Sequence, residues 1–190
     1  SYGRSSLYLV LKEEVDGQMQ GGVVKFPLRF TSSAMRPRFN PHDGHLYIAG
    51  LKGWQSNAGR ITGLDRVRYT GAKVYTVNGL KVDKAGVHLS FTQKLDPKTA
   101  TDPQNYAVRR WNYKRTQAYG SPTFKVSDPE QRGNETVNIT SAKLSDDGKT
   151  VTLNVEDLRP CDQQHIKFRI TAGDGTQINS EVMHTIHVVK

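Results

Sequence analysis

The feature that most constrains the fold is a series of turn signals, each followed by a short run with β-strand character. In the segment 38–50, Pro41 presets φ and Gly44 accepts a positive φ, so the residues between them favour a turn. Leu46, Tyr47 and Ile48 then predict a strand. The same sequence of turn and strand returns at 59–71. Similar units recur along the whole chain, so we predict an all-β protein with many tight turns.

The spacing of these units divides the chain near residue 75. Strands expected around 6–11, 21–27, 34–50 and 60–70 would form a propeller-blade-like sheet, a segment that we place at 1–75. Beyond a seam at 71–79, about seven short alternating runs are separated by turns roughly every ten residues. This pattern favours an Ig-like β-sandwich, which we place at 76–190.

The first half resembles a known family. The run Asp43-Gly44-His45-Leu46-Tyr47 and the run Arg66-Val67-Arg68-Tyr69-Thr70-Gly71 are similar to the last blade of bacterial secreted sorbosone- or glucose-dehydrogenase-like propellers. In the second half, Leu89–Val108 and Leu144–Leu153 resemble the signature of bacterial Ig-like domains of the S-layer type. Together the halves look like the C-terminal region of such propeller proteins, some of which bind haem.

This resemblance implies a periplasmic or extracellular bacterial location and a structural role beside the rest of a parent propeller. In relatives the propeller would carry a quinone-dependent or sugar-oxidising site, but no motif for those catalytic residues is present here. The chain begins at Ser1 without Met, and we expect it to be part of a larger protein. We therefore expect no cofactor, no metal and no enzyme activity in this chain by itself.

The net charge and the single cysteine indicate which partners and which cysteine chemistry to expect. The formal net charge is +9, which fits an ordinary soluble surface of mixed charge or, alternatively, affinity for a polyanion such as nucleic acid, an acidic polysaccharide or an acidic protein. No block of five basic residues occurs, so nucleic acid is not the expected partner, and no apolar run is long enough to span a membrane. The single cysteine, Cys161, excludes an internal disulfide, and we expect it to be either a buried small hydrophobic residue or an unreactive thiol in a loop.

The candidate ligand-binding residues lie in a long segment at 109–124, where aromatic and basic side chains interleave. Rings beside cations can stack on sugars and hold anionic groups, whereas the alternative is that the rings anchor a long loop to the sandwich. Trp54 has the same two interpretations. The candidate set comprises Trp54, Arg109, Arg110, Trp111, Tyr113, Lys114, Arg115 and Tyr119.

Three functional hypotheses follow from the sequence. The first is a non-catalytic structural and assembly region of a larger exported oxidoreductase-like propeller protein. The second is a carbohydrate-binding module that uses Trp54 and the segment 109–124. The third is a contribution from Arg36, Arg38, His42 or His45 to a sugar-oxidising site in a propeller outside this chain. Exposed rings would favour sugar binding, and buried rings would favour bracing of the fold.

Overall fold

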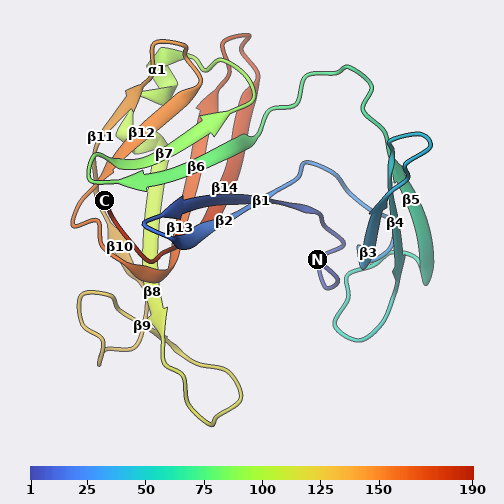
Figure 1. Cartoon of the computed structure of the whole chain (residues 1–190), viewed down its shortest axis with the longest axis horizontal. Helices are drawn as coiled ribbons and strands as arrows, with labels where there is room; N and C mark the ends of the chain where they lie inside the picture. The colour runs from blue at the N-terminus through green and yellow to red at the C-terminus, as the bar shows by residue number, and fades with distance from the viewer. The chain divides into compact units, whose positions relative to one another are not determined.

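The computed structural model describes residues 1–190 and consists almost entirely of β-strands, which confirms the all-β prediction (Figure 1). The strands form three antiparallel sheets. The strands are β1 (Tyr8–Val15), β2 (Gln18–Lys25), β3 (Arg36–Phe39), β4 (Leu46–Leu51), β5 (Thr62–Val67), β6 (Val77–Asp83), β7 (Gly86–Phe91), β8 (Tyr106–Tyr113), β9 (Thr123–Phe124), β10 (Glu135–Val137), β11 (Ile139–Leu144), β12 (Thr150–Val155), β13 (Cys161–Thr171) and β14 (Gln177–Ile186).

Two short helices lie between β7 and β8: α1 (Pro97–Ala100) and the 3₁₀ helix η1 (Pro103–Asn105). The side chains of Asp96 and Asp102 accept hydrogen bonds from backbone N–H groups of these helices, and a proline follows each aspartate. Asp-Pro thus supplies the helix cap and the first helical residue in both cases. No helix in the structure has the length and apolar character needed to cross a bilayer.

The chain folds into two compact units. The small unit comprises Ser1–Leu9 and Lys25–Lys73, and the large unit comprises Val10–Val24 and Val74–Lys190. The change of unit at residue 73 falls within the predicted seam. The assignment of all of 1–75 to one segment differs from the structure, because the hairpin of β1 and β2 belongs mostly to the large unit.

The large unit is a β-sandwich. One sheet has the strand order β1-β2-β14-β13-β8-β10, with β9 paired to β8, and the other has the order β11-β12-β7-β6. Figure 1 shows the second sheet in front of the first. Alternating apolar residues meet between the sheets, and the rings of Phe91 and Phe168 pack edge to face with centroids 5.5 Å apart. β7, one of the alternating runs beyond the predicted seam, is therefore a strand of the core.

A row of polar residues crosses the inner side of the larger sheet. Arg110 on β8 lies opposite Gln164 on β13, and Gln164 lies opposite His184 on β14. The row ends at Gly22 on β2, where a Cβ atom would lie 2.4 Å from the Cβ of His184. Arg110, Gln164 and His184 are each at most 3% exposed. The core of the sandwich is thus polar along this row.

A second polar contact fixes the β1–β2 hairpin in the sandwich. The buried amide oxygen of Gln20 accepts hydrogen bonds from the backbone N–H groups of His187 and Val188, at 2.8 and 2.9 Å. Its Nε2 donates to the carbonyl oxygen of Val188 and to the carboxylate of Glu13. Glu13 also accepts a hydrogen bond from the backbone N–H of Val82 on β6. These contacts link the hairpin to both the C-terminal segment and the second sheet.

The small unit is built on the three-stranded sheet β3-β4-β5. Segment 31–34 lies across one face of this sheet, over Gly50 and Gly63. A Cβ atom at residue 50 would lie 1.5 Å from the carbonyl oxygen of Ser33, and one at residue 63 would lie 2.7 Å from the Cβ of Ser32. The two glycines are therefore required for this close approach.

Candidate functional site

The predicted basic and aromatic segment 109–124 is divided between strand and loop. β8 continues to Tyr113, so Arg109 through Tyr113 lie on a strand rather than in a loop. β9 pairs back on β8, with Asn112 opposite Phe124. Only residues 114–122 form the connecting loop. The position of each side chain consequently depends on which face of β8 it occupies.

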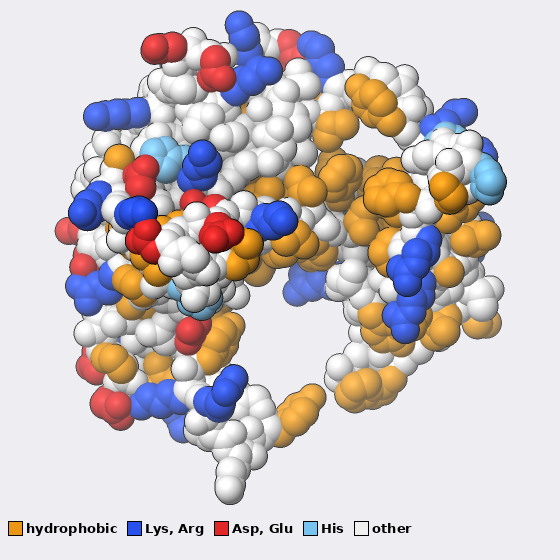
Figure 2. All heavy atoms as spheres, viewed as in Figure 1, with side chains coloured by type: hydrophobic (Ala, Val, Ile, Leu, Met, Phe, Trp, Pro, Cys, Tyr) orange, Lys and Arg blue, Asp and Glu red, His pale blue; other side chains and the backbone are white.

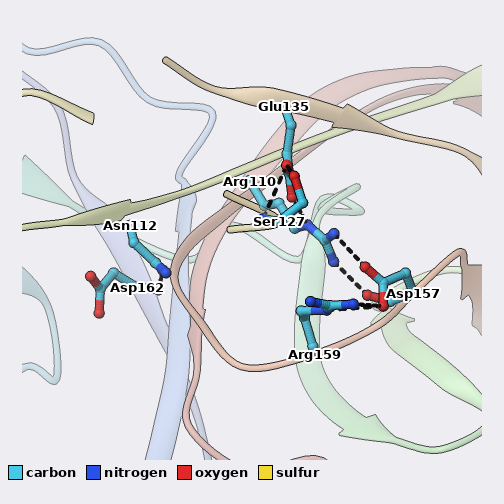
Figure 3. A network of polar contacts seen from close by, with 7 residues as sticks. All are labelled: Arg110, Asn112, Ser127, Glu135, Asp157, Arg159 and Asp162. Atoms are coloured by element: carbon cyan, nitrogen blue, oxygen red, sulfur yellow. Dashed lines mark hydrogen bonds and ion pairs between the residues drawn. The ribbon is translucent and has the colours of Figure 1, made fainter. Parts of the chain in front are cut away.

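Arg110 faces the interior and is the centre of an ionic network (Figure 3). Its guanidinium donates to the carboxylate of Glu135 on β10 and, at 2.9 Å, to the carboxylate of Asp157. It also donates to the backbone carbonyl of Asp157. Glu135 in turn accepts from the hydroxyl of Ser127, and Asp157 pairs with Arg159. Five residues from β8, β10 and two loops are thus joined through one buried arginine.

Arg110 differs from the other candidate ligand-binding residues, because its guanidinium already pairs with two carboxylates. Burial raises the pKa of Glu135, but the hydrogen bonds from Ser127 and Arg110 outweigh that effect and lower it overall. The pKa of Asp157 is lowered by Arg110 and then by Arg159. Arg110 is 3% exposed and pairs with these carboxylates, which gives it a structural role in the sandwich, and its contact with a ligand stays a prediction.

Arg109 and Trp111 occupy the opposite face of β8, on the outer side of the larger sheet. Arg109 is exposed and lies opposite His165, which pairs with Glu181 at 2.9 Å. Trp111 is half-buried opposite Gln163, and its indole N–H makes no hydrogen bond. The Trp111 ring is therefore not a fully exposed platform.

A cleft with a volume of about 640 Å³ lies beside the loop that follows β8. Tyr113, Lys114 and Arg115 from the candidate set contribute to its wall. The remaining lining residues are Thr116, Ala118, Gly120, Ser121, Asp162, Thr185 and His187. The cleft combines one phenol ring, one imidazole, two basic side chains, hydroxyl groups and one carboxylate.

Hydrogen bonds hold the base of this loop in place. The backbone N–H of Tyr113 donates to the carboxylate of Asp162 at 2.8 Å, and the N–H of Asp162 donates to the side chain of Asn112 at 2.9 Å. Lys114 pairs with Glu130 at 2.8 Å, and its ammonium lies 4.5 Å from the centre of the Phe124 ring. Lys114 therefore anchors the loop, whereas Arg115 is exposed beside the cleft.

Sequence reasoning missed the part of the cleft that comes from β13, β14 and the C-terminal segment. Asp162, Thr185 and His187 lie 40 residues or more along the chain from Tyr113. No local motif marks them. They reach the cleft because β13 pairs with both β8 and β14.

The two remaining candidate rings are fully open to solvent. Tyr119 lies in the loop after β8 and is 107% exposed, and Trp54 lies in the small unit and is 83% exposed. Neither ring packs on the body of its unit, and a contact of either ring with a ligand stays a prediction. Tyr119 does not line the cleft, and Trp54 belongs to a different unit.

The small unit presents a second candidate surface. Strand register places Arg38, Tyr47 and Arg66 in one row across the sheet, and Arg36, Ala49 and Leu64 in the adjacent row. Both rows lie on the face opposite segment 31–34, because residues two apart on a strand share a face. We call this surface the arginine face. Its three arginines are exposed, and Leu64 is 73% exposed.

Large apolar side chains are also exposed elsewhere in the small unit. Phe39, Leu51, Ile61 and Tyr69 are between 45% and 79% exposed. Figure 2 shows hydrophobic and basic side chains close together over the part of the chain that carries β3, β4 and β5. β3 and β5 are the edges of their sheet, so their outer backbone groups have no strand partner. Such surfaces usually mark a contact with other protein.

The arrangement of the potential metal ligands and the state of the single cysteine are the remaining features of the site chemistry. No three His, Cys, Asp or Glu side chains are arranged to hold a metal ion. Cys161 is buried at the start of β13, and burial raises the pKa of its thiol to about 11. At neutral pH this thiol stays protonated and is a poor nucleophile.

The fold and these surfaces define an all-β protein with a β-sandwich unit and a small, open β-sheet unit. Comparison with protein-family models, with curated proteins and with solved structures found no match to this chain. The relation to dehydrogenase-like propellers and to S-layer-type Ig-like domains therefore stays a prediction from sequence motifs.

Proposed function

We propose that this chain is a non-catalytic structural and assembly region of a larger exported propeller protein, with the small unit as its point of contact. The observation that carries the proposal is the open sheet β3-β4-β5, which has two unpaired edges and several exposed large apolar side chains. Segment 31–34 lies on one face of this three-stranded sheet, and the other face is exposed. Such a sheet gains stability by packing against further protein. Additional β-structure of the parent protein, or a separate subunit, would supply that contact.

Site-specific photo-cross-linking in the producing cells tests this proposal. A photoreactive residue at Leu64 or Tyr69, both strongly exposed in the small unit, is expected to form one or a few discrete protein adducts. The same residue at Lys143, which is exposed on β11 of the sandwich, serves as the matched control and is expected to form none. Diffuse or absent adducts from both small-unit positions would contradict an assembly role.

A second function, binding of a neutral or anionic glycan, is favoured by the cleft beside Tyr113 and Arg115. Stacking on Tyr113 would survive high salt, whereas a contact of Arg115 with an anionic group would weaken with salt. A glycan array followed by titration at low and high salt tests this. Tyr113→Ala should remove the salt-resistant part of binding and Arg115→Ala the salt-sensitive part, whereas Arg109→Ala, outside the cleft, should change neither. No binding to any glycan would leave the assembly role alone.

A further inference from the structure

The charge of the chain is concentrated in the small unit. Residues 1–9 and 25–73 contain ten Lys and Arg but only two Asp, Asp43 and Asp65, which gives a formal charge of +8. The large unit, with more than twice as many residues, therefore contributes only +1 of the chain's +9. The near-even mixture of signs on the sandwich is ordinary for a soluble surface, whereas the excess on the small unit is not.

The three arginines of the arginine face have few acidic neighbours. None of Arg36, Arg38 and Arg66 forms an ion pair, and Arg36 and Arg38 donate only to the backbone carbonyls of the residues before them. Asp65 points to the other face, because it pairs in register with Ile48. The pKa of the Asp43 carboxyl is lowered mainly by the hydrogen bond from the backbone N–H of His45, then by the hydrogen bond from the Tyr47 hydroxyl, and the charge of Arg66 adds only a small effect.

The same face carries apolar surface between its charges. Leu64 lies in the row of Arg36 and two residues along β5 from Arg66, and it is 73% exposed. Exposed leucine contributes nothing to phosphate or sulfate recognition but contributes to a protein interface. Seven of the ten basic residues of the small unit are arginine, the basic residue that is enriched in protein interfaces and binds carboxylates through two parallel hydrogen bonds.

We propose that the arginine face is the docking site for a carboxylate-rich surface of a partner protein, with Arg36, Arg38 and Arg66 pairing with carboxylates around an apolar contact to Leu64. This inference rests on the proposed assembly function and names the chemistry of the partner. Symmetric pairing of two arginine faces does not fit, because two faces of the same strong positive charge repel each other.

Acidic polypeptides serve as the probes. Labelled poly-L-glutamate and the random copolymer poly(Glu,Tyr) are titrated with the full chain, and affinity is measured by fluorescence anisotropy at low and physiological salt. The triple variant R36Q/R38Q/R66Q is expected to bind both polymers about tenfold more weakly, because three exposed charge contacts are lost. The matched control K81Q/K143Q/K167Q removes the same charge from exposed positions of the sandwich and is expected to stay within twofold of the unmodified chain.

Leu64→Ser separates a protein interface from a general polyanion surface. We expect it to weaken poly(Glu,Tyr) binding roughly threefold and to leave poly-L-glutamate binding unchanged, because only the copolymer offers an apolar partner. Heparin and single-stranded RNA are titrated in parallel. Binding of these polyanions that depends on the three arginines, together with no effect of Leu64→Ser on the copolymer, would overturn the proposal in favour of a sulfate or phosphate ligand.

Equal losses in the two triple variants would also overturn the proposal, since total charge would then decide binding. The assembly function is judged separately by the cross-linking experiment. Cross-links at Leu64 without arginine-dependent binding of acidic polypeptide would overturn only the inference that the partner surface is rich in carboxylates. Binding of acidic polypeptide without any cross-link in cells would instead remove the proposed function on which the inference rests.

Discussion

Gln20 shows how one side chain joins distant parts of the chain. Its amide group satisfies two backbone N–H groups and one carbonyl at His187 and Val188, more than 160 residues away. It also contacts Glu13, which binds the backbone of β6. The side chain is 4% exposed, so water cannot readily replace it. Buried hydrogen-bonding groups that lose their partner cost stability.

We therefore expect Gln20→Leu to lower the free energy of unfolding by roughly 2–4 kcal/mol, because several backbone groups lose their partner. Denaturant unfolding followed by circular dichroism measures the change. Gln18→Leu, on the same strand but exposed, is the control and should stay within about 0.5 kcal/mol of the unmodified chain. Similar losses for the two variants would show that the Gln20 contacts are not what stabilises the hairpin.

His184 gives the stability of the protein a dependence on pH. It is 1% exposed and its Nε2 is 2.9 Å from the amide oxygen of Gln164. Burial lowers its pKa from the ordinary 6.5 to about 4. The unfolded chain therefore binds a proton at this residue before the folded chain does. The contribution of neutral, buried His184 to the free energy of unfolding is therefore complete above about pH 6.5 and is lost as the pH falls towards 4.

For the unmodified chain we expect a fall in the free energy of unfolding between pH 6.5 and 4 that includes up to about 3 kcal/mol from His184. In His184→Leu, the slope of the free energy of unfolding against pH should fall over this range by the equivalent of about one bound proton, whatever the substitution does to the absolute stability. His42→Leu, at an exposed turn, should leave the slope as it is. Urea unfolding at a series of pH values provides the comparison, and parallel curves for the unmodified and His184→Leu chains would count against this assignment.

At the scale of elements, the small sheet depends on a close approach between a strand and a crossing segment. Segment 31–34 forms hydrogen bonds to the loop before β5, where the N–H groups of Gly59 and Arg60 both donate to the carbonyl of Thr31. It crosses β4 at Gly50, where a side chain has no space. The buried side chain of Ile48 lies on this same covered face.

Gly50→Ala should therefore loosen the small unit while the sandwich stays folded. The added Cβ would overlap the backbone of Ser33, so segment 31–34 has to move away from the sheet. Hydrogen–deuterium exchange should accelerate in 31–67 and remain slow in β13 and β14. Gly59→Ala is the control, since its Cβ would be at an ordinary 3.6 Å from the nearest atom. Unchanged exchange in Gly50→Ala would mean that the small unit tolerates the displacement.

At the scale of the whole molecule, the chain passes between its two units more than once. It starts in the small unit, contributes the β1–β2 hairpin to the large unit, returns for residues 25–73, and ends in the large unit. β2 covers the edge of β14, and Leu11, Val15 and Val24 of the hairpin are buried. Removing the chain before residue 74 consequently removes part of the sandwich.

Two shortened chains test this arrangement. Replacing residues 27–72 with a flexible Gly/Ser linker keeps the hairpin and should leave the unfolding midpoint of the sandwich nearly unchanged. Deleting residues 1–73 should lower its stability by about 4 kcal/mol or more, because three buried apolar side chains and the partner of β14 are lost. Thermal and denaturant unfolding distinguish the two, and equal stability would refute an integral role for the hairpin.

Local chemistry accounts for what could be predicted from the sequence. Alternation of apolar and polar residues is visible in any short window, so the strand at 86–91 and the all-β class were predictable. Turn residues such as Asp43 and Gly44 act through their own backbone and side chain, and they do form the turn before β4. The excess of Lys and Arg over Asp in the small unit could not be recognised in this way, because it depends on knowing which residues form that unit.

The amino-acid sequence by itself determined where strands and turns form, because those preferences act over a few neighbouring residues. Only the tertiary structure decided that the 10–24 hairpin joins the sandwich, since its pairing partner β14 lies more than 150 residues away. The same holds for Arg110, whose buried role depends on Glu135 and Asp157 from other strands and loops. The cleft at Tyr113 and the arginine face likewise exist only because strand register places distant residues on one surface.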